Sequence, residues 1–352
     1  MSEKILIKGN EAVAEAALAA GCRHFFGYPI TPQSELAAYL ARRMPKVGGT
    51  YLQAESEIAA INMVYGASAA GVRCMTSSSS PGISLKSEGL SYLAGCDLPA
   101  VIVNVQRGGP GLGSIQPSQA DYFQATRGGG HGDYHIMVLA PGGVQEMYSF
   151  TVRAFDLADQ YRMTVMLLTD GILGQMMEPV LPSAPADGGG GALCDKPWAV
   201  GGGSGKRGRN IINSLYLKPS DLEKTNIERY EKYKTVETDG QMSDGYLLDD
   251  AEVVVAAYGA SSRIAKNAID EARSRGVRAG LLRPITLWPF PKKAFAKAAE
   301  HARAFISLEM SMGQMIEDIE LAIRCSRPVT LCNRVGGVAP EPGQVLEAVL
   351  NA

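Results

Sequence analysis

The first 185 residues alternate between short apolar runs and segments with apolar or small residues at helical spacing. The apolar runs predict buried strands within residues 24–29, 72–78, 99–107, 135–141 and 163–171. The intervening periodic segments predict helices within residues 57–71, 82–96 and 144–161. Strands without polar alternation, separated by helices, are typical of a parallel sheet that is covered on both faces. The pattern therefore predicts an α/β domain.

A second α/β pattern begins near residue 246. Its predicted strands fall within residues 251–262, 277–290, 303–310 and 328–337, and residues 263–276 form a helix closed by glycine. Between the two patterns lie two glycine clusters and one predicted helix at 219–234, for which Ser220 is the expected N-cap. We expect three parts: a domain at 1–185, a connecting arm at 186–245 and a smaller domain at 246–352.

Composition narrows the class of protein. Of 352 residues, 46% are apolar and 20% charged, and the formal net charge is -2, which is the balance of an ordinary globular protein. There is no basic stripe, no membrane-length apolar run and no secretory leader pattern, so we expect a cytoplasmic protein without nucleic-acid or membrane partners. The six cysteines show no Cys-x-x-Cys spacing. We therefore expect reduced, packed thiols and no metal ligands in this chain.

Two carboxylates stand at the start of the predicted helix at 57–71. Glu55 and Glu57 precede turns that are almost entirely apolar or small. One interpretation is that both are helix-start carboxylates favoured by the helix dipole. The other is that one of them is desolvated there and holds or passes a proton.

An arginine and a threonine follow two of the predicted strands. Arg107 ends the strand at 99–107 and precedes a glycine-rich loop, where ligands of open parallel sheets bind. Its guanidinium suits a carboxylate or phosphate, although a solvated surface arginine is the alternative. Thr31 lies between Pro29 and Pro32, which restrict the backbone on both sides. Its hydroxyl either orients a small ligand or caps a helix that begins at Pro32.

Five stretches, in order along the chain, carry a family resemblance: "GNEAVAEAALAAGCRHFFGYPITPQSEL", "AESEIAAINMVYGASAAG", "SSSSPGISLKSEGLSYLAG", "NVQRGGPGLG" and "QPSQADYFQATRGGGHGDY". Together they resemble the alpha-type subunit of the 2-oxoacid:ferredoxin oxidoreductases, most closely the branched-chain (2-oxoisovalerate) type. The resemblance implies a thiamine diphosphate-binding fold of the pyrimidine type, followed by a smaller domain like the C-terminal domain of transketolase.

The resemblance also implies cofactors and partners. Thiamine diphosphate would be shared with a beta-type subunit, which holds the diphosphate, Mg²⁺ and an iron-sulfur cluster, and coenzyme A would be the co-substrate. Gamma and ferredoxin-like subunits and ferredoxin would be further partners. The sequence agrees with this division, since it has no Gly-Asp-Gly motif with a downstream Asn, and no set of cysteines spaced for a cluster.

Matching positions carry over as site residues. Glu57 would hydrogen-bond N1′ of the aminopyrimidine, and Pro29 and Ile30 would lie against the cofactor. Thr31 and Arg107 would hold the substrate carboxylate that leaves as CO₂. The implied reaction is coenzyme A-dependent oxidative decarboxylation of a branched 2-oxo acid with reduction of ferredoxin. The alternatives are the 2-oxoglutarate-specific enzyme and a non-catalytic α/β scaffold subunit.

Overall fold

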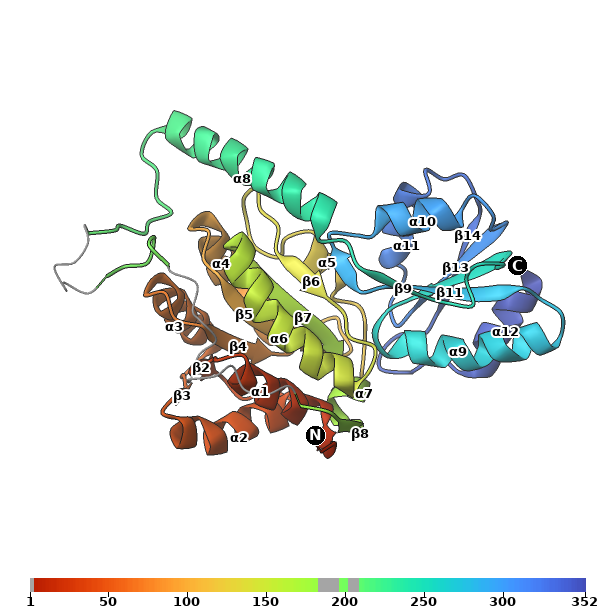
Figure 1. Ribbon diagram of the computed structural model, residues 1–352, viewed down its shortest axis with the longest axis horizontal. Coiled ribbons are helices and arrows are strands. Elements are labelled where there is room, and N and C mark those ends of the chain that lie inside the picture. Colours follow the sequence, from red (N-terminus) through yellow and green to blue (C-terminus); the bar gives the residue numbers. More distant parts are fainter. Residues whose placement is uncertain (1–2, 183–195, 202–208) are drawn as a thin grey trace.

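The computed structural model describes residues 3–182, 196–201 and 209–352 (Figure 1). Most of the two predicted glycine clusters lies outside these residues. The first unit is built on a seven-stranded sheet, and its strands lie in the order β12 (Thr286–Trp288), β6 (Met137–Leu139), β7 (Thr164–Asp170), β5 (Ala100–Gln106), β4 (Cys74–Ser78), β2 (His24–Gly27) and β3 (Thr50–Gln53). All neighbours are parallel except β12 and β6. The predicted parallel α/β architecture is confirmed.

Helices cover both faces of this sheet. Contacts group α1 (Gly9–Ala19), α2 (Ser34–Arg43) and α6 (Val144–Tyr161) on one face, and α3 (Glu57–Ala69) with α4 (Ser80–Gly95) on the other. This grouping is what right-handed crossovers require when the strand order reverses after β3. Three short helical segments also belong here: α5 (Tyr122–Thr126), α7 (Gly171–Gln175) and a 3₁₀ turn at Met44–Val47. An antiparallel pair, β1 (Ile5–Lys8) and β8 (Met177–Val180), forms a separate two-stranded sheet that contacts α1 and α6.

The second unit has a five-stranded sheet of its own. Its strands lie in the order β14 (Val329–Asn333), β13 (Ala304–Glu309), β10 (Val253–Ala257), β11 (Ala279–Pro284) and β9 (Ser243–Tyr246), with only β9 antiparallel to its neighbour. Four helices complete it: α9 (Gly259–Ser274), α10 (Lys292–Ala298), α11 (Met315–Ala322) and α12 (Pro342–Asn351). Between β11 and α10 the chain returns to the first unit, where β12 pairs with β6 in the first sheet.

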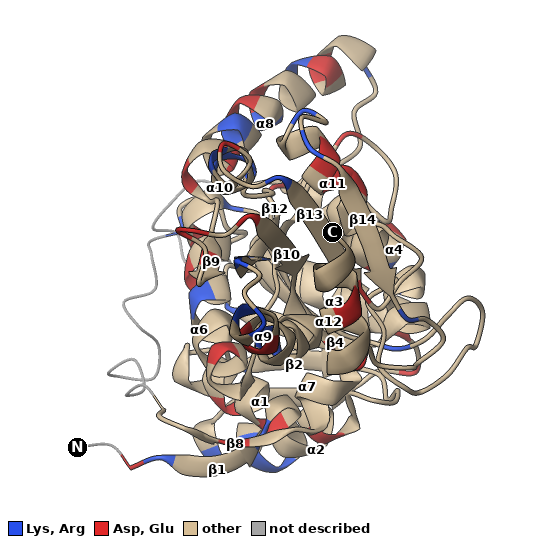
Figure 2. Cartoon of the chain, turned by 90° about the vertical axis from the view of Figure 1, so that its right-hand side faces the viewer, with Lys and Arg blue, Asp and Glu red and all other residues tan. Residues whose placement is uncertain are grey.

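The segment between the units contains a long charged helix, α8 (Pro219–Asp239), shown in Figure 2 with acidic and basic residues along its length. It lies on the first unit, where Arg229 and Lys232 both pair with Asp97. The expectation that Ser220 is the N-cap is wrong. Lys218 holds that position and Pro219 is the first helical residue, because proline has no N–H to satisfy and its fixed φ suits a helix start.

The junction between the units is held by buried polar contacts. The Gln119 side chain donates to the Tyr258 carbonyl oxygen at 2.8 Å and accepts from the Ser261 hydroxyl at 2.8 Å. The Arg283 guanidinium makes two 2.7 Å bonds to the Glu146 carboxylate. Because Gln119, Ser261 and Arg283 are buried, separating the units would remove the hydrogen-bond partners of these side chains, and the contacts therefore favour one arrangement of the two sheets.

Candidate active site

The candidate residues gather at the carboxyl edge of the first sheet. Strands β5, β4, β2 and β3 are neighbours there, and their ends lead into Arg107, the turn before α4, Thr31 and the start of α3. Parallel strands end at the same edge of a sheet, so residues distant in sequence come together. The fold therefore brings Thr31, Glu57 and Arg107 to one edge.

Thr31 and Arg107 are in direct contact. One terminal nitrogen of the Arg107 guanidinium donates to the Thr31 carbonyl oxygen at 3.0 Å, and the other donates to the Leu112 carbonyl oxygen at 3.1 Å. The arginine is buried, and its Nε has no hydrogen-bond partner among the described residues. The interpretation of Arg107 as a solvated surface side chain is wrong. Main-chain carbonyls hold the guanidinium in place, and no carboxylate of the described residues pairs with its charge.

The Thr31 hydroxyl is not used as a helix cap. Helix α2 begins at Ser34 rather than at Pro32, and Gln33 is its N-cap residue. Thr31 is exposed, and no hydrogen bond of its hydroxyl occurs within the described residues. The capping alternative is therefore wrong, since the turn at residues 28–33 adds two non-helical residues. Pro29 and Ile30 lie in the same turn, with Pro29 exposed and Ile30 half-buried.

A polar network contacts the backbone of Arg107. The Ser80 hydroxyl accepts from the Arg107 backbone N–H at 3.0 Å and donates to the Asp121 carboxylate at 2.7 Å. Asn104 donates to the same carboxylate oxygen at 2.9 Å. Burial raises the pKa of Asp121 although these two hydrogen bonds oppose the rise. The sequence analysis missed this network, because its members are separated by 17 to 41 positions.

Glu57 and Glu55 have different environments. Glu57 is the first residue of α3 and is 6% exposed, whereas Glu55 is exposed. Ser56 caps the helix by accepting from the Ala59 N–H at 3.2 Å, so Glu57 is not needed as a cap. No hydrogen bond to the Glu57 carboxylate occurs within the described residues. A buried carboxylate without a hydrogen-bond partner is costly, so its position is suited to a ligand.

Helix α4 packs tightly against the Glu57 carboxylate at Gly82. A Cβ atom added to Gly82 would overlap Ser78 Oγ and lie 2.8 Å from Glu57 Oε1. Both the Ser78 and Ser79 hydroxyls are buried and have no hydrogen-bond partner among the described residues. The glycine therefore lets the helix approach Ser78 and Glu57 closely. The serines stand in the quoted "SSSSPG" stretch, and that run of hydroxyl residues at a strand's end was the available signal.

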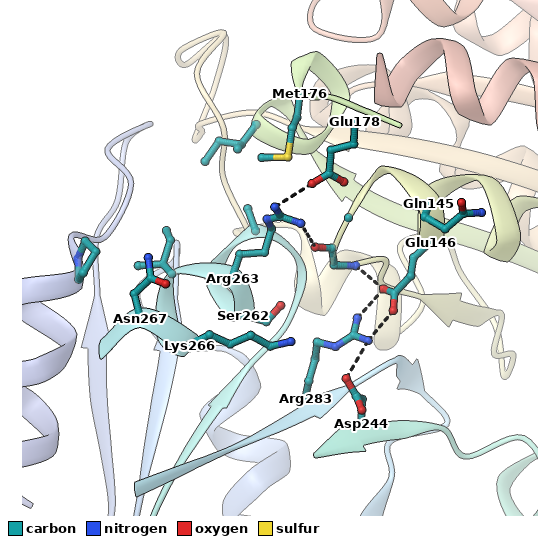
Figure 3. Close-up of a pocket in the computed structure, with 16 residues that line it drawn as sticks. Gln145, Glu146, Met176, Glu178, Asp244, Ser262, Arg263, Lys266, Asn267 and Arg283 are labelled. Carbon is teal, nitrogen blue, oxygen red and sulfur yellow. Dashed lines mark hydrogen bonds and ion pairs between the residues drawn. The ribbon is translucent and has the colours of Figure 1, made fainter. Parts of the chain in front are cut away.

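A separate cavity of about 720 Å³ lies at the junction of the two units (Figure 3). Four of the charged side chains that line it form two ion pairs, Arg263 with Glu178 and Arg283 with Glu146. Its lining includes none of Thr31, Glu57 and Arg107. The ion pairs join the two units across the cavity.

Comparison with known families agrees with this arrangement. Residues 15–187 match the family model described as pyruvate flavodoxin/ferredoxin oxidoreductase, thiamine diphosphate-binding, and residues 251–345 match the model for core domain II of pyruvate:ferredoxin oxidoreductase. The ketoisovalerate oxidoreductase subunit VorB of Methanothermobacter thermautotrophicus is 52% identical, over 98% of this chain and 96% of that relative. This chain belongs to the 2-oxoacid:ferredoxin oxidoreductases.

Two further relatives are less similar to this chain. The 2-oxoglutarate synthase subunit KorA of Methanothermobacter thermautotrophicus is 38% identical, over 99% of both chains. The 2-oxoglutarate:ferredoxin oxidoreductase from Magnetococcus marinus, solved with 2-oxoglutarate, coenzyme A and succinyl-CoA bound, superposes with a TM-score of 0.87 at 28% identity. That match covers 99% of this 2-oxoacid:ferredoxin oxidoreductase chain but only 65% of the solved chain.

The fold itself is shared more widely. A split-gene transketolase, solved as an inactive beta4 tetramer, matches 98% of each chain with a TM-score of 0.61 at 14% identity. Identity this low supports the fold alone. The superposition confirms the expected thiamine diphosphate-binding fold with its transketolase-like second unit. In the described part of this 2-oxoacid:ferredoxin oxidoreductase, no helix is long and apolar enough to cross a membrane.

Proposed function

We propose that this chain is the subunit of a branched-chain 2-oxoacid:ferredoxin oxidoreductase that acts on 2-oxoisovalerate. The reaction is coenzyme A-dependent oxidative decarboxylation, which yields acyl-CoA and CO₂ and transfers electrons to ferredoxin. The support is the gradient of similarity: the ketoisovalerate relative is 52% identical, and the 2-oxoglutarate relative is 38% identical at similar coverage.

The observation that carries the proposal is the contact between Arg107 and Thr31 at the edge where Glu57 is buried. The guanidinium charge has no carboxylate partner within the described residues, and the threonine hydroxyl beside it is exposed. Together they would bind the carboxylate of a 2-oxo acid and orient its carbonyl group. Because decarboxylation removes that charge, binding accelerates the step only where it favours the transition state over the bound substrate.

The residues present also fit the aminopyrimidine of thiamine diphosphate. Glu57 would hydrogen-bond N1′ and hold or release a proton there, because it is buried and its carboxylate accepts no hydrogen bond within the described residues. Pro29 and Ile30 would lie against the same ring. When bound, thiamine diphosphate stabilises negative charge at the carbon that loses CO₂, which side chains alone cannot do.

The remaining parts of the enzyme would come from partner subunits. We propose a beta-type subunit with the diphosphate site, Mg²⁺ and an iron-sulfur cluster, together with gamma and ferredoxin-like subunits in the cytoplasm. An exposed apolar side chain beside the site supports docking, since Leu112, whose carbonyl accepts from Arg107, is 83% exposed. We keep the division at 1–185, 186–245 and 246–352 as a proposal.

A second candidate is the 2-oxoglutarate-specific enzyme. It is favoured by the solved relative with bound 2-oxoglutarate, which superposes over 99% of this chain. The substrate 2-oxoglutarate carries a second carboxylate that 2-oxoisovalerate lacks, and binding it would require another cation in addition to Arg107. Within the described residues, Arg107 is the cation that contacts Thr31.

The test is an assay of the purified native complex against a panel of 2-oxo acids, with coenzyme A and a low-potential dye as electron acceptor. We expect the highest kcat/KM with 2-oxoisovalerate. In the same complex, Thr31→Ala and Arg107→Ala should raise KM for the 2-oxo acid by about tenfold and a hundredfold, because charged hydrogen bonds are the stronger ones. Unchanged KM values in both variants would favour a scaffold subunit, and preference for 2-oxoglutarate would favour the second candidate.

A further inference from the structure

Helix α4 carries a fully buried lysine, Lys86, that the proposed mechanism does not use. Its Nζ donates to Thr76 Oγ1 at 3.0 Å and to the Ser77 carbonyl oxygen at 3.0 Å, both on β4. Lysine is among the side chains that are almost never fully buried unless paired. Lys86 takes part in no ion pair within the described residues. Its burial is expensive, and the packing of the helix alone does not explain it.

Lys86 lies next to the Glu57 carboxylate. Gly82 is one helical turn before it on the same face of α4, and Glu57 Oε1 comes within 2.8 Å of the Cβ position of Gly82. Residues four apart on a helix are about 5–6 Å apart at Cβ. One turn further along, Gly89 meets the Ile61 side chain of α3 in the same way. Lys86 therefore sits within the tight crossing of α3 and α4, close to Glu57.

A hydrogen-bond chain also connects Lys86 to the turn that carries Thr31. Ser77, whose carbonyl accepts from Lys86, donates through its hydroxyl to Gln33 Oε1 at 2.6 Å. Gln33 in turn donates through Nε2 to the Tyr28 carbonyl at 3.3 Å and through its backbone N–H to the Ile30 carbonyl at 3.2 Å. The chain ends on the residues that flank Pro29.

We propose that Lys86 is a positioning residue that links the two halves of the site. It places its amine beside the Glu57 carboxylate, and through Ser77 and Gln33 it fixes the turn that presents Thr31. The inference rests on the proposed function, because it assigns Lys86 a role toward the residue that would contact the aminopyrimidine.

The charge state of Lys86 is consistent with this role. Burial lowers its pKa to about 7, and the Glu57 carboxylate acts in the opposite direction. Strand β4 contributes only the neutral acceptors Thr76 and Ser77, and Glu57 on α3 is the ionisable group that acts on the amine. The positive charge beside Glu57 is therefore complete well below pH 7 and is lost as the pH rises through about 7.

The experiment uses the assembled complex with Lys86→Met, which keeps most of the length and removes the charge and the hydrogen bonds. Because this variant has no amine to titrate, its kcat/KM profile should lack the step near pH 7 that we expect in wild type. The KM for the 2-oxo acid should rise by about fivefold as the turn loosens. The pH dependence of thiamine diphosphate affinity, measured by calorimetric titration of the cofactor-free complex, should lose the same step, which requires no turnover.

Three further variants make the result decisive. Lys86→Arg keeps the charge and should retain a KM close to that of wild type. Lys86→Gln replaces Lys86→Met if Lys86→Met does not assemble. Ser68 lies near the C-terminal end of α3, and Ser68→Ala removes the buried hydrogen bond from its hydroxyl to the Pro99 carbonyl oxygen. This control should leave both profiles unchanged. Wild-type profiles in Lys86→Met or Lys86→Gln would overturn the role of Lys86. Full turnover in Glu57→Gln would instead overturn the proposed function.

Discussion

Two buried glutamates, one in each unit, have opposite surroundings. Glu309 ends β13, and its carboxylate accepts from the backbone N–H groups of Gln314, Met315 and Ile316 and from two serine hydroxyls. Glu57 begins α3, and its carboxylate receives no hydrogen bond within the described residues. Both are buried, at 0% and 6% exposure.

The difference separates a structural carboxylate from a functional one. A buried charge whose hydrogen-bonding capacity is filled by its own chain stabilises the turn around it, here the turn from β13 into α11. A buried carboxylate left without partners lowers stability and is retained where a ligand supplies the missing contact. We therefore expect substitution of Glu57 to reduce activity more than stability, and substitution of Glu309 to reduce stability more than activity.

The largest expected effect is on turnover in Glu57→Gln. The amide cannot hold the proton at N1′, so kcat should fall by about 10³-fold, while the thermal unfolding temperature of the complex stays within about 2 °C. Dye reduction and scanning calorimetry on the same preparation measure both quantities. Glu55→Gln, two residues away on the exposed side, is the control and should keep wild-type turnover.

Glu309→Gln should show the reverse pattern. The amide group would face donors that now contact a carboxylate oxygen, leaving buried N–H groups unsatisfied at a cost of about 3 kcal/mol. We expect lower thermal stability and poorer assembly, with kcat per assembled complex within about twofold of wild type. A selective loss of kcat in fully assembled enzyme would contradict the structural assignment of Glu309.

Gly82→Ala tests the space between the two helices. The new Cβ would overlap Ser78 Oγ and crowd Glu57 Oε1, so kcat/KM should fall by about 10²-fold and stability by about 1–3 kcal/mol. Adding Ser78→Ala should recover most of the stability but not the activity, because the contact with Glu57 remains. Gly66→Ala is the matched control, since its Cβ would meet no atom within 4 Å, and it should be neutral or slightly stabilising.

The smallest effect concerns Asp170, a third buried carboxylate, which accepts from Ile172, Leu173 and Ala260 N–H groups at the junction. Burial raises its pKa to about 6, above the unfolded value of about 3.9. The stability it contributes is thus complete below pH ~4 and is lost as the pH rises to about 6. Unfolding temperatures between pH 4 and 7 should show this decline in wild type and not in Asp170→Asn. Parallel curves would contradict it.

Much of the fold could be predicted because its strands are buried on both faces. The runs at 99–107 and 163–171 became β5 and β7, which are fully buried. Strand β3 was missed, because as an edge strand it is largely exposed and has no apolar run. The placement of β12 was also missed, since a crossing of Thr286–Trp288 into the other sheet leaves no periodic signal.

The sequence by itself determined the residue types of the site. It placed Thr31, Glu57 and Arg107 at strand or helix ends, and the resemblance gave each a role. Only the tertiary structure decided which alternative holds at each position, by burying Glu57 rather than Glu55 and by setting Arg107 against the Thr31 carbonyl. The same structure showed that Lys86 is buried, although the sequence of α4 gives no sign of this. Burial and hydrogen bonding depend on which segments become neighbours, and strand order decides that.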